Sequence, residues 1–178
     1  MRYITLVALA VASFSAAAAP EQFKSVAQLM DSYQDFRDYK DHPGFKVLSE
    51  KPLHIQVSPA VFEKSSVEQI KTAIEKASVY AAYRSLYQTP ATSIKVTVLP
   101  LSINMDTLEM KYLQSGKIDF TATKKQAVNL VKQYGNITNE EDVITASGDW
   151  TPKFQNCCYL ESGKPGVAAF SKQLINYK

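Results

Sequence analysis

Hydrophobic and polar positions follow two different periods in the middle of the chain. Leu53–Val57 is a short apolar run with polar residues at alternate positions, and Ile94–Val98 alternates in the same way. Between them, Ser65–Gln88 repeats its apolar residues with the period of an α-helix. The pattern predicts a strand, a long helix and a second strand. The simplest arrangement is a crossover between parallel strands, and the alternative is a sheet in which the two strands are not neighbours.

Helical periodicity also occurs on both sides of this central unit. Ser25–Lys40 and Thr123–Tyr134 each begin with a hydroxyl residue that is followed three residues later by glutamine, which is the pattern of a capping box. Asn139–Thr145 and Val167–Tyr177 predict shorter helices, and Cys157–Leu160 predicts a strand.

Two further alternating runs predict a hairpin. Leu108–Tyr112 and Ile118–Ala122 flank Ser115–Lys117, which contains a glycine suited to a tight turn. Asp106 followed by Glu109 is also compatible with a helix start, so Leu108–Tyr112 is either strand or helix, and we favour the strand.

The first residues have the pattern of a secretory signal peptide. Arg2 precedes an apolar run over Tyr3–Phe14, and small residues follow. We expect cleavage after Ala18, which leaves residues 19–178 as one exported domain. An uncleaved anchor is the alternative, although the apolar run is short for a bilayer, which needs about 20 residues. No later stretch is long and apolar enough to form a transmembrane segment.

Chain length and net charge narrow the predicted class of protein further. Without Arg2 the chain has 19 basic and 17 acidic residues, and this balance with no dense basic stripe argues against nucleic acid as a partner. A chain of this length is sufficient for one hydrophobic core. We predict a single α+β domain with three main helices on a mixed sheet of about four or five strands.

Aromatic and basic residues supply the candidate binding groups. Helical spacing places Tyr80, Tyr83 and Tyr87 on one side of the central helix. They form either the partly solvated rim of its buried face, with the hydroxyls at the surface, or an exposed aromatic platform for a ligand or partner. Trp150 is either folded onto the core or exposed as an anchor for a partner. The free backbone N–H groups at the start of the helix predicted from Thr123 could hold an anion with help from three lysines, which are Lys117, Lys124 and Lys125. The alternative is that these lysine side chains simply face solvent.

The chain has two cysteines, Cys157 and Cys158, which are adjacent. They are candidates for two buried thiols, a strained vicinal disulfide or an intermolecular bridge. His42 and His54 have no ligand spacing, so no metal site is predicted, and no cofactor motif is present. A Cys157–His54 dyad is a candidate for thiol chemistry, although nothing in the sequence places a base beside the thiol.

These observations predict an exported, non-catalytic binding protein that engages another protein through aromatic surface patches. One alternative is a secreted enzyme with a dispersed site, using a thiol. The other is a small-ligand or anion-binding protein. The sequence identifies neither the partner nor the oligomeric state.

Overall fold

The computed structural model describes residues 19–39 and 41–177. The predicted leader, Met1–Ala18, and its cleavage site lie outside these residues, so both remain predictions. In the described part of the chain, no helix combines the length and the apolar character needed to cross a bilayer.

The predicted strand–helix–strand unit forms the centre of the fold. It consists of β2 (Leu53–Val57), α2 (Val67–Gln88) and β4 (Ser93–Val98). Strands β2 and β4 are parallel neighbours, which confirms the crossover. The helix begins after Ser66, which forms a capping box with Gln69, one residue later than the sequence pattern places it.

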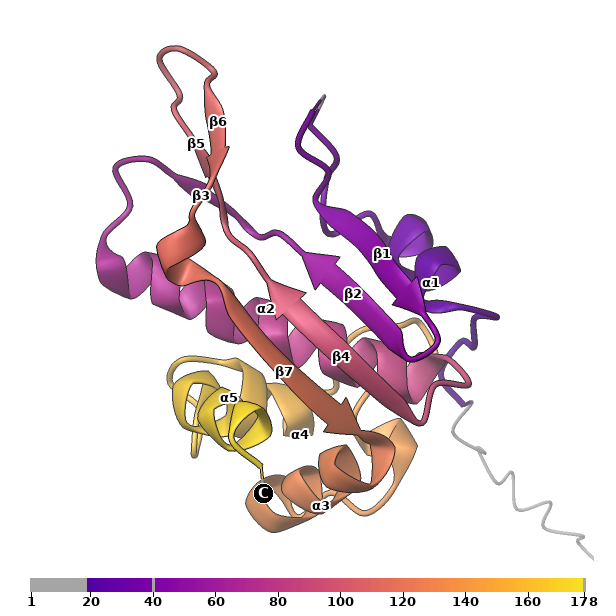
Figure 1. The fold of residues 1–178 in the computed structure, drawn as a ribbon. Helices are drawn as coiled ribbons and strands as arrows, with labels where there is room; N and C mark the ends of the chain where they lie inside the picture. The colour runs from indigo at the N-terminus through magenta and orange to yellow at the C-terminus, as the bar shows by residue number, and fades with distance from the viewer. Residues whose placement is uncertain (1–18, 40, 178) are drawn as a thin grey trace, which may run out of the picture.

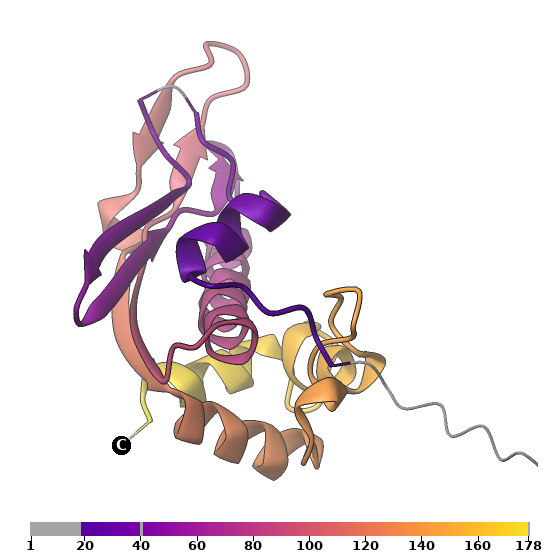
Figure 2. The ribbon, with the colours of Figure 1, turned by 90° about the vertical axis from the view of Figure 1, so that its right-hand side faces the viewer.

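Two antiparallel strands complete the main sheet. Strand β1 (Phe45–Glu50) pairs with β2, and β7 (Ile118–Thr123) pairs with β4, so the strand order is β1-β2-β4-β7. The described helices lie on one face of this sheet, and none of them covers its other face (Figures 1 and 2). The molecule is therefore a single α+β domain, in agreement with the predicted class.

A smaller sheet replaces the predicted hairpin. It contains β3 (Ala60–Phe62), β5 (Leu101–Ile103) and β6 (Met110–Tyr112) in the order β3-β5-β6. The predicted pairing of 108–112 with 118–122 is wrong, because β6 pairs with β5 while β7 pairs with β4. The glycine turn between them is instead a 3₁₀ turn, η1 (Gln114–Gly116).

Several of the remaining helices differ from the sequence pattern, whereas α3 has the predicted length. Helix α1 spans Val26–Tyr33 rather than Ser25–Lys40, because Gln34 takes the left-handed conformation and ends it. The predicted strand at the cysteines is a π-helical turn, η3 (Gln155–Tyr159). The other elements are α3 (Lys124–Gly135), η2 (Glu140–Asp142), α4 (Pro152–Phe154) and α5 (Val167–Ile175).

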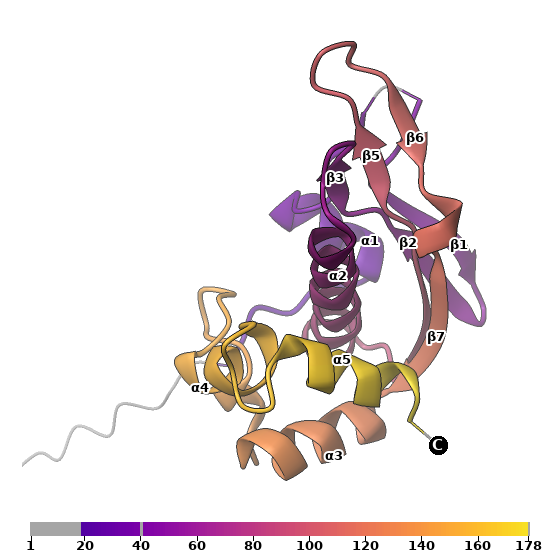
Figure 3. The ribbon, with the colours of Figure 1, turned by 90° about the vertical axis from the view of Figure 1, so that its left-hand side faces the viewer.

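Helix α2 is buried along its second half. Every residue from Ala77 to Gln88 is buried, because the sheet covers one side of the helix and other helices cover the opposite side (Figure 3). The first half of α2 extends past these neighbours and remains partly exposed. This asymmetry decides which of the predicted site residues can reach a ligand.

A buried arginine connects α2 to two other segments. The Arg84 guanidinium donates to the carbonyl of Gly148 at 2.5 Å and to Oε1 of Gln88 at 3.0 Å. It lies 4.2 Å from the ring centre of Tyr33 and 4.6 Å from that of Trp150. Cation–π and hydrogen-bond partners thus compensate a desolvated charge, and they join α1, α2 and the 145–151 loop.

Candidate functional site

The four aromatic residues predicted as a binding surface lie in the core. Tyr80, Tyr83, Tyr87 and Trp150 are each at most 8% exposed. Phe154 packs between two of them, with its ring centre 5.1 Å from that of Tyr83 and 4.9 Å from that of Trp150. Trp150 is folded onto the core, which is one of its two predicted states. Neither interpretation of the tyrosines, as a partly solvated rim or as an exposed platform, is correct, because α2 is covered on both sides at these positions.

The tyrosine hydroxyls show how these rings are held inside. The Tyr83 hydroxyl donates to the carbonyl of Ala127 at 2.9 Å, and that of Tyr80 donates to the Asp35 carboxylate. Burial raises the pKa of Tyr80, Tyr83 and Tyr87 well above the ordinary value for a phenol. These groups are therefore neutral core residues.

The three lysines predicted to hold an anion are not brought together. Lys117 and Lys124 flank β7 at opposite ends, roughly 20 Å apart by the rise of an extended strand. Lys117 pairs with Asp119 at 3.4 Å, and Lys124 pairs with Glu140 at 2.9 Å. Lys125 is exposed beside Lys124. Two of the three charges are thus already balanced by carboxylates.

The cysteines form a vicinal disulfide inside the helical layer. Cys157 and Cys158 are bonded to each other and both are buried, so the structure selects the vicinal ring among the three predicted states. Ile55 points to the core on the helix-covered face of the sheet, so its strand neighbour His54 points to the opposite, helix-free face. The sheet therefore separates the proposed dyad partners Cys157 and His54.

His54 belongs to a polar row across three strands. Its Nε2 lies 2.8 Å from Oγ1 of Thr97, and the Thr97 hydroxyl donates to Asp119 at 2.5 Å. Because the hydroxyl uses its proton on Asp119, His54 must donate to it through Nε2. The hydrogen bond from Thr97 lowers the pKa of Asp119, while burial and Lys95 lower that of His54. The row joins β2, β4 and β7.

Metal ligands do not gather among the described residues. Within 19–39 and 41–177, no three His, Cys, Asp or Glu side chains are placed to hold an ion.

Exposed apolar side chains gather instead on a projecting hairpin. We define the arm as β5, the loop Asn104–Glu109 and β6, together with the adjacent β3. It extends beyond the main sheet at the end where α2 begins (Figure 1). Phe62, Met105 and Leu108 are 58%, 63% and 68% exposed, respectively. Phe62 and Met105 line one small hollow of about 60 Å³.

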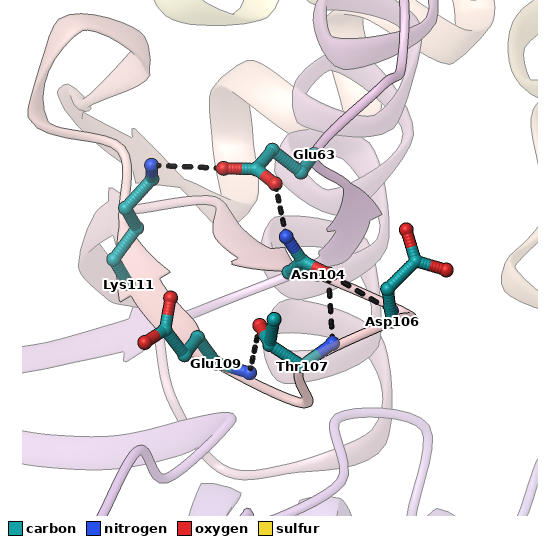
Figure 4. Close-up of polar contacts among 6 residues, drawn as sticks. All are labelled: Glu63, Asn104, Asp106, Thr107, Glu109 and Lys111. Carbon is teal, nitrogen blue, oxygen red and sulfur yellow. Dashed lines mark hydrogen bonds and ion pairs between the residues drawn. The ribbon is translucent and has the colours of Figure 1, made fainter.

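Hydrogen bonds from one asparagine side chain fix the arm loop (Figure 4). Oδ1 of Asn104 accepts from the backbone N–H groups of Asp106 at 2.8 Å and Thr107 at 3.0 Å. Its Nδ2 donates to the Glu63 carboxylate at 2.5 Å, which joins the loop to β3. Oγ1 of Thr107 accepts from the N–H of Glu109 at 3.3 Å. An Asx turn of this kind holds a loop in one shape.

Two ion pairs add to the same connection. Lys111 on β6 pairs with Glu63 at 3.2 Å, so this carboxylate contacts both the loop and the far strand. Lys64 pairs with Asp106 at 3.3 Å, but both side chains are largely in solvent. Lys111 and Glu63 are also exposed, at 66% and 40% of their side-chain surface. Exposed pairs of this kind contribute little to stability. The hydrogen bonds of the Asn104 side chain are therefore the main polar support of the arm loop.

Leu108 is held in an unusual conformation at the end of the loop. Its φ is +58°, in the left-handed region that a bulky L-residue rarely adopts. Such a conformation costs roughly 1–2 kcal/mol, and a side chain that is 68% exposed gains little packing in return. Backbone strain that the fold does not need is a recurring property of binding sites.

A second surface is an apolar groove of about 830 Å³ beside the exposed half of α2. One wall is the first half of α2, the second is α5, and the third is the segment from Leu113 through η1 to the start of β7. The larger apolar side chains of these walls are Val67, Ile70, Ile74, Leu113, Ile118 and Ile175. This volume lies within the range of small-molecule sites.

The sequence pattern could not indicate either surface. The arm needs a pairing between β5 and β6 that the favoured hairpin excludes, and the groove combines three elements from distant parts of the chain. A partial indication was available for the arm, because Met105 and Leu108 are large apolar residues within a polar segment.

No protein-family model, curated protein or solved structure matches this chain. A functional proposal therefore depends on the surface chemistry of the chain itself.

Proposed function

We propose that this chain is an exported, non-catalytic binding protein whose protein partner docks on the arm. The observation that carries the proposal is the exposure of Phe62, Met105 and Leu108 on one rigid projection. Large apolar side chains that gather on a protein surface are typical of interaction sites. Aromatic residues and methionine are also enriched at interfaces.

The rigidity of the arm supports binding rather than simple exposure. The Asn104 turn and the hydrogen bond from Asn104 to Glu63 order the loop before any partner arrives. Ordering in advance reduces the conformational entropy that association would otherwise lose. The strained Leu108 is in keeping with this role, because its side chain is directed outward at a cost to stability.

Export, and binding in preference to thiol catalysis, are supported by separate observations. The leader pattern of residues 1–18 favours export, and a disulfide between Cys157 and Cys158 is the state that an oxidising compartment maintains. The buried disulfide leaves no free thiol for the enzyme alternative, since the chain has two cysteines in all. The polar row at His54 lies on the helix-free face of the sheet, so the sheet separates it from the disulfide.

The test compares two double variants of the exported protein. In the arm variant, Phe62→Ser is combined with Met105→Ser. In the control variant, Val47→Ser is combined with Leu48→Ser on β1, where the native side chains are also exposed. Partner bound to tagged protein from the native compartment is identified by mass spectrometry, and its affinity for each variant is then titrated.

We expect the arm variant to bind at least tenfold more weakly, because truncating an anchor residue costs more than 1.4 kcal/mol at a hot spot. The control variant should retain the native affinity. Equal losses in the two variants would show that binding does not use the arm. A monomer that has no partner and turns over a hydrolytic substrate would contradict the whole proposal.

A further inference from the structure

We infer that the groove between α2, α5 and the η1–β7 segment binds a free long-chain carboxylate. This inference goes beyond the proposed function, because it concerns a different surface and a different class of ligand. The carboxylate would place its alkyl chain along the apolar walls and its head group beside the lysines at the rim.

The walls suit an alkyl chain. On α2 the apolar residues Val67, Ile70 and Ile74 form one stripe at helical spacing, and Ile175 faces them from α5. The opposite wall also includes Ala168 and Ala169, whose short side chains keep the groove wide. A chain buried here gains roughly 0.8 kcal/mol for each methylene group.

The charges at the groove favour an anion. Its ionisable side chains are Lys71 and Glu75 on α2 and Lys172 on α5, which leaves one net positive charge. Lys71 pairs with Glu75 at the long distance of 3.9 Å. Among the described residues, Lys172 has no acidic partner within 4 Å. The ammonium group of Lys172 is therefore available to a carboxylate.

The same walls suit a peptide less well. Two of the three walls are helices, whose backbone N–H and C=O groups are already paired along the helix. The third wall includes one strand residue, Ile118 at the start of the edge strand β7. An extended peptide needs free backbone partners along its length, and a sheet edge normally supplies them. An alkyl chain with one polar end has no such requirement.

The experiment measures binding of monomeric amphiphiles by calorimetry, below the concentrations at which they form micelles. Octanoate, decanoate and dodecanoate are compared with dodecanol and dodecylamine. We expect the affinity of the carboxylates to rise about fourfold for each added methylene group. Dodecanoate should bind more tightly than either the alcohol or the amine.

Three variants locate the ligand. Lys172→Gln should weaken dodecanoate binding about threefold to fivefold, as loss of a partly exposed charge pair does, and leave dodecanol binding unchanged. Lys164→Gln, at an exposed lysine outside the groove, is the matched control and should change neither. Ala169→Phe fills the groove from an exposed position and should abolish both.

Several results would overturn the inference. Equal or tighter binding of dodecanol or dodecylamine would remove the role of the lysines. Binding of phospholipid vesicles or an apolar peptide without any monomeric carboxylate would assign the groove to another ligand. None of these results would affect the arm, because Ala169→Phe should leave the affinity for the protein partner unchanged.

Discussion

Substitutions at Leu108 can separate two effects of the arm loop, its effect on stability and its effect on partner binding. Leu108→Ala removes the exposed side chain but keeps a β-carbon in the left-handed conformation. Leu108→Gly removes the side chain and the conformational penalty together. The two variants lose the same apolar contact with a partner, so they differ only in the backbone.

The expected magnitude follows from two opposing contributions. Relief of the left-handed conformation gains about 1–2 kcal/mol, and the greater freedom of glycine in the unfolded chain costs about 0.5–1 kcal/mol. Leu108→Gly should therefore be more stable than Leu108→Ala, by up to about 1.5 kcal/mol. At the size of this domain, 1 kcal/mol corresponds to a difference of about 2–4 °C in Tm.

Urea unfolding followed by circular dichroism measures the difference, and partner titration measures binding. Both variants should lose affinity to the same extent. A Gly variant that is less stable than the Ala variant would show that the native loop does not hold Leu108 under strain. A retained affinity in both variants would show that the Leu108 side chain is not part of the interface.

Three other predictions test the core and the export. Arg84→Ala should lower the free energy of unfolding by about 3 kcal/mol, because charge-assisted hydrogen bonds and ring contacts are lost together; a change below about 1 kcal/mol in urea unfolding would contradict this. Burial raises the pKa of Tyr80, Tyr83 and Tyr87, and also that of Tyr159 and Tyr112, so stability should be complete below pH 10 and fall above it, since the unfolded chain releases these protons first. The three core tyrosines alone contribute a slope of up to about 4 kcal/mol per pH unit. Tyr87→Phe should reduce the slope by about 1.4 kcal/mol per pH unit in alkaline titrations, and an unchanged slope would count against the burial of its hydroxyl. The intact, non-reduced mass of the exported protein should correspond to cleavage after Ala18 and to the loss of two hydrogens at Cys157–Cys158; a mass that includes the leader would contradict cleavage.

Local rules predicted the central unit well. Strand β2, helix α2 and strand β4 differ from their predicted ranges by at most two residues, because each combines a clear hydrophobic period with a proline or a cap at its ends. The capping box of Thr123 with Gln126 was predicted at the correct residues for the same reason. Signals of this kind depend on neighbours in sequence alone.

The tyrosine stripe shows where periodicity is insufficient. Spacing identifies Tyr80, Tyr83 and Tyr87 as one side of a helix, but it does not show how many neighbours surround that helix. Here α2 is enclosed by the sheet and by other helices, so even Arg84 and Gln88 are buried. The number of packed layers is a tertiary property that the pattern does not contain.

The arm was missed for a different reason. The strand Met110–Tyr112 was within a predicted strand, but its partner is Leu101–Ile103 rather than the strand after the glycine turn. Both pairings are short-range and antiparallel, and alternation alone does not choose between them. The Asn104 turn, which makes the observed pairing possible, has no strong signature in a single sequence.

Site-specific photo-crosslinking tests the central claim most directly. A photoreactive amino acid replaces Met105 on the arm in one protein and Leu48 on β1 in another, and both are irradiated in the native compartment. We expect one discrete crosslinked protein at position 105, none at position 48, and loss of the product when Phe62→Ser is added. The same product from both positions, or its persistence with Phe62→Ser, would contradict docking on the arm.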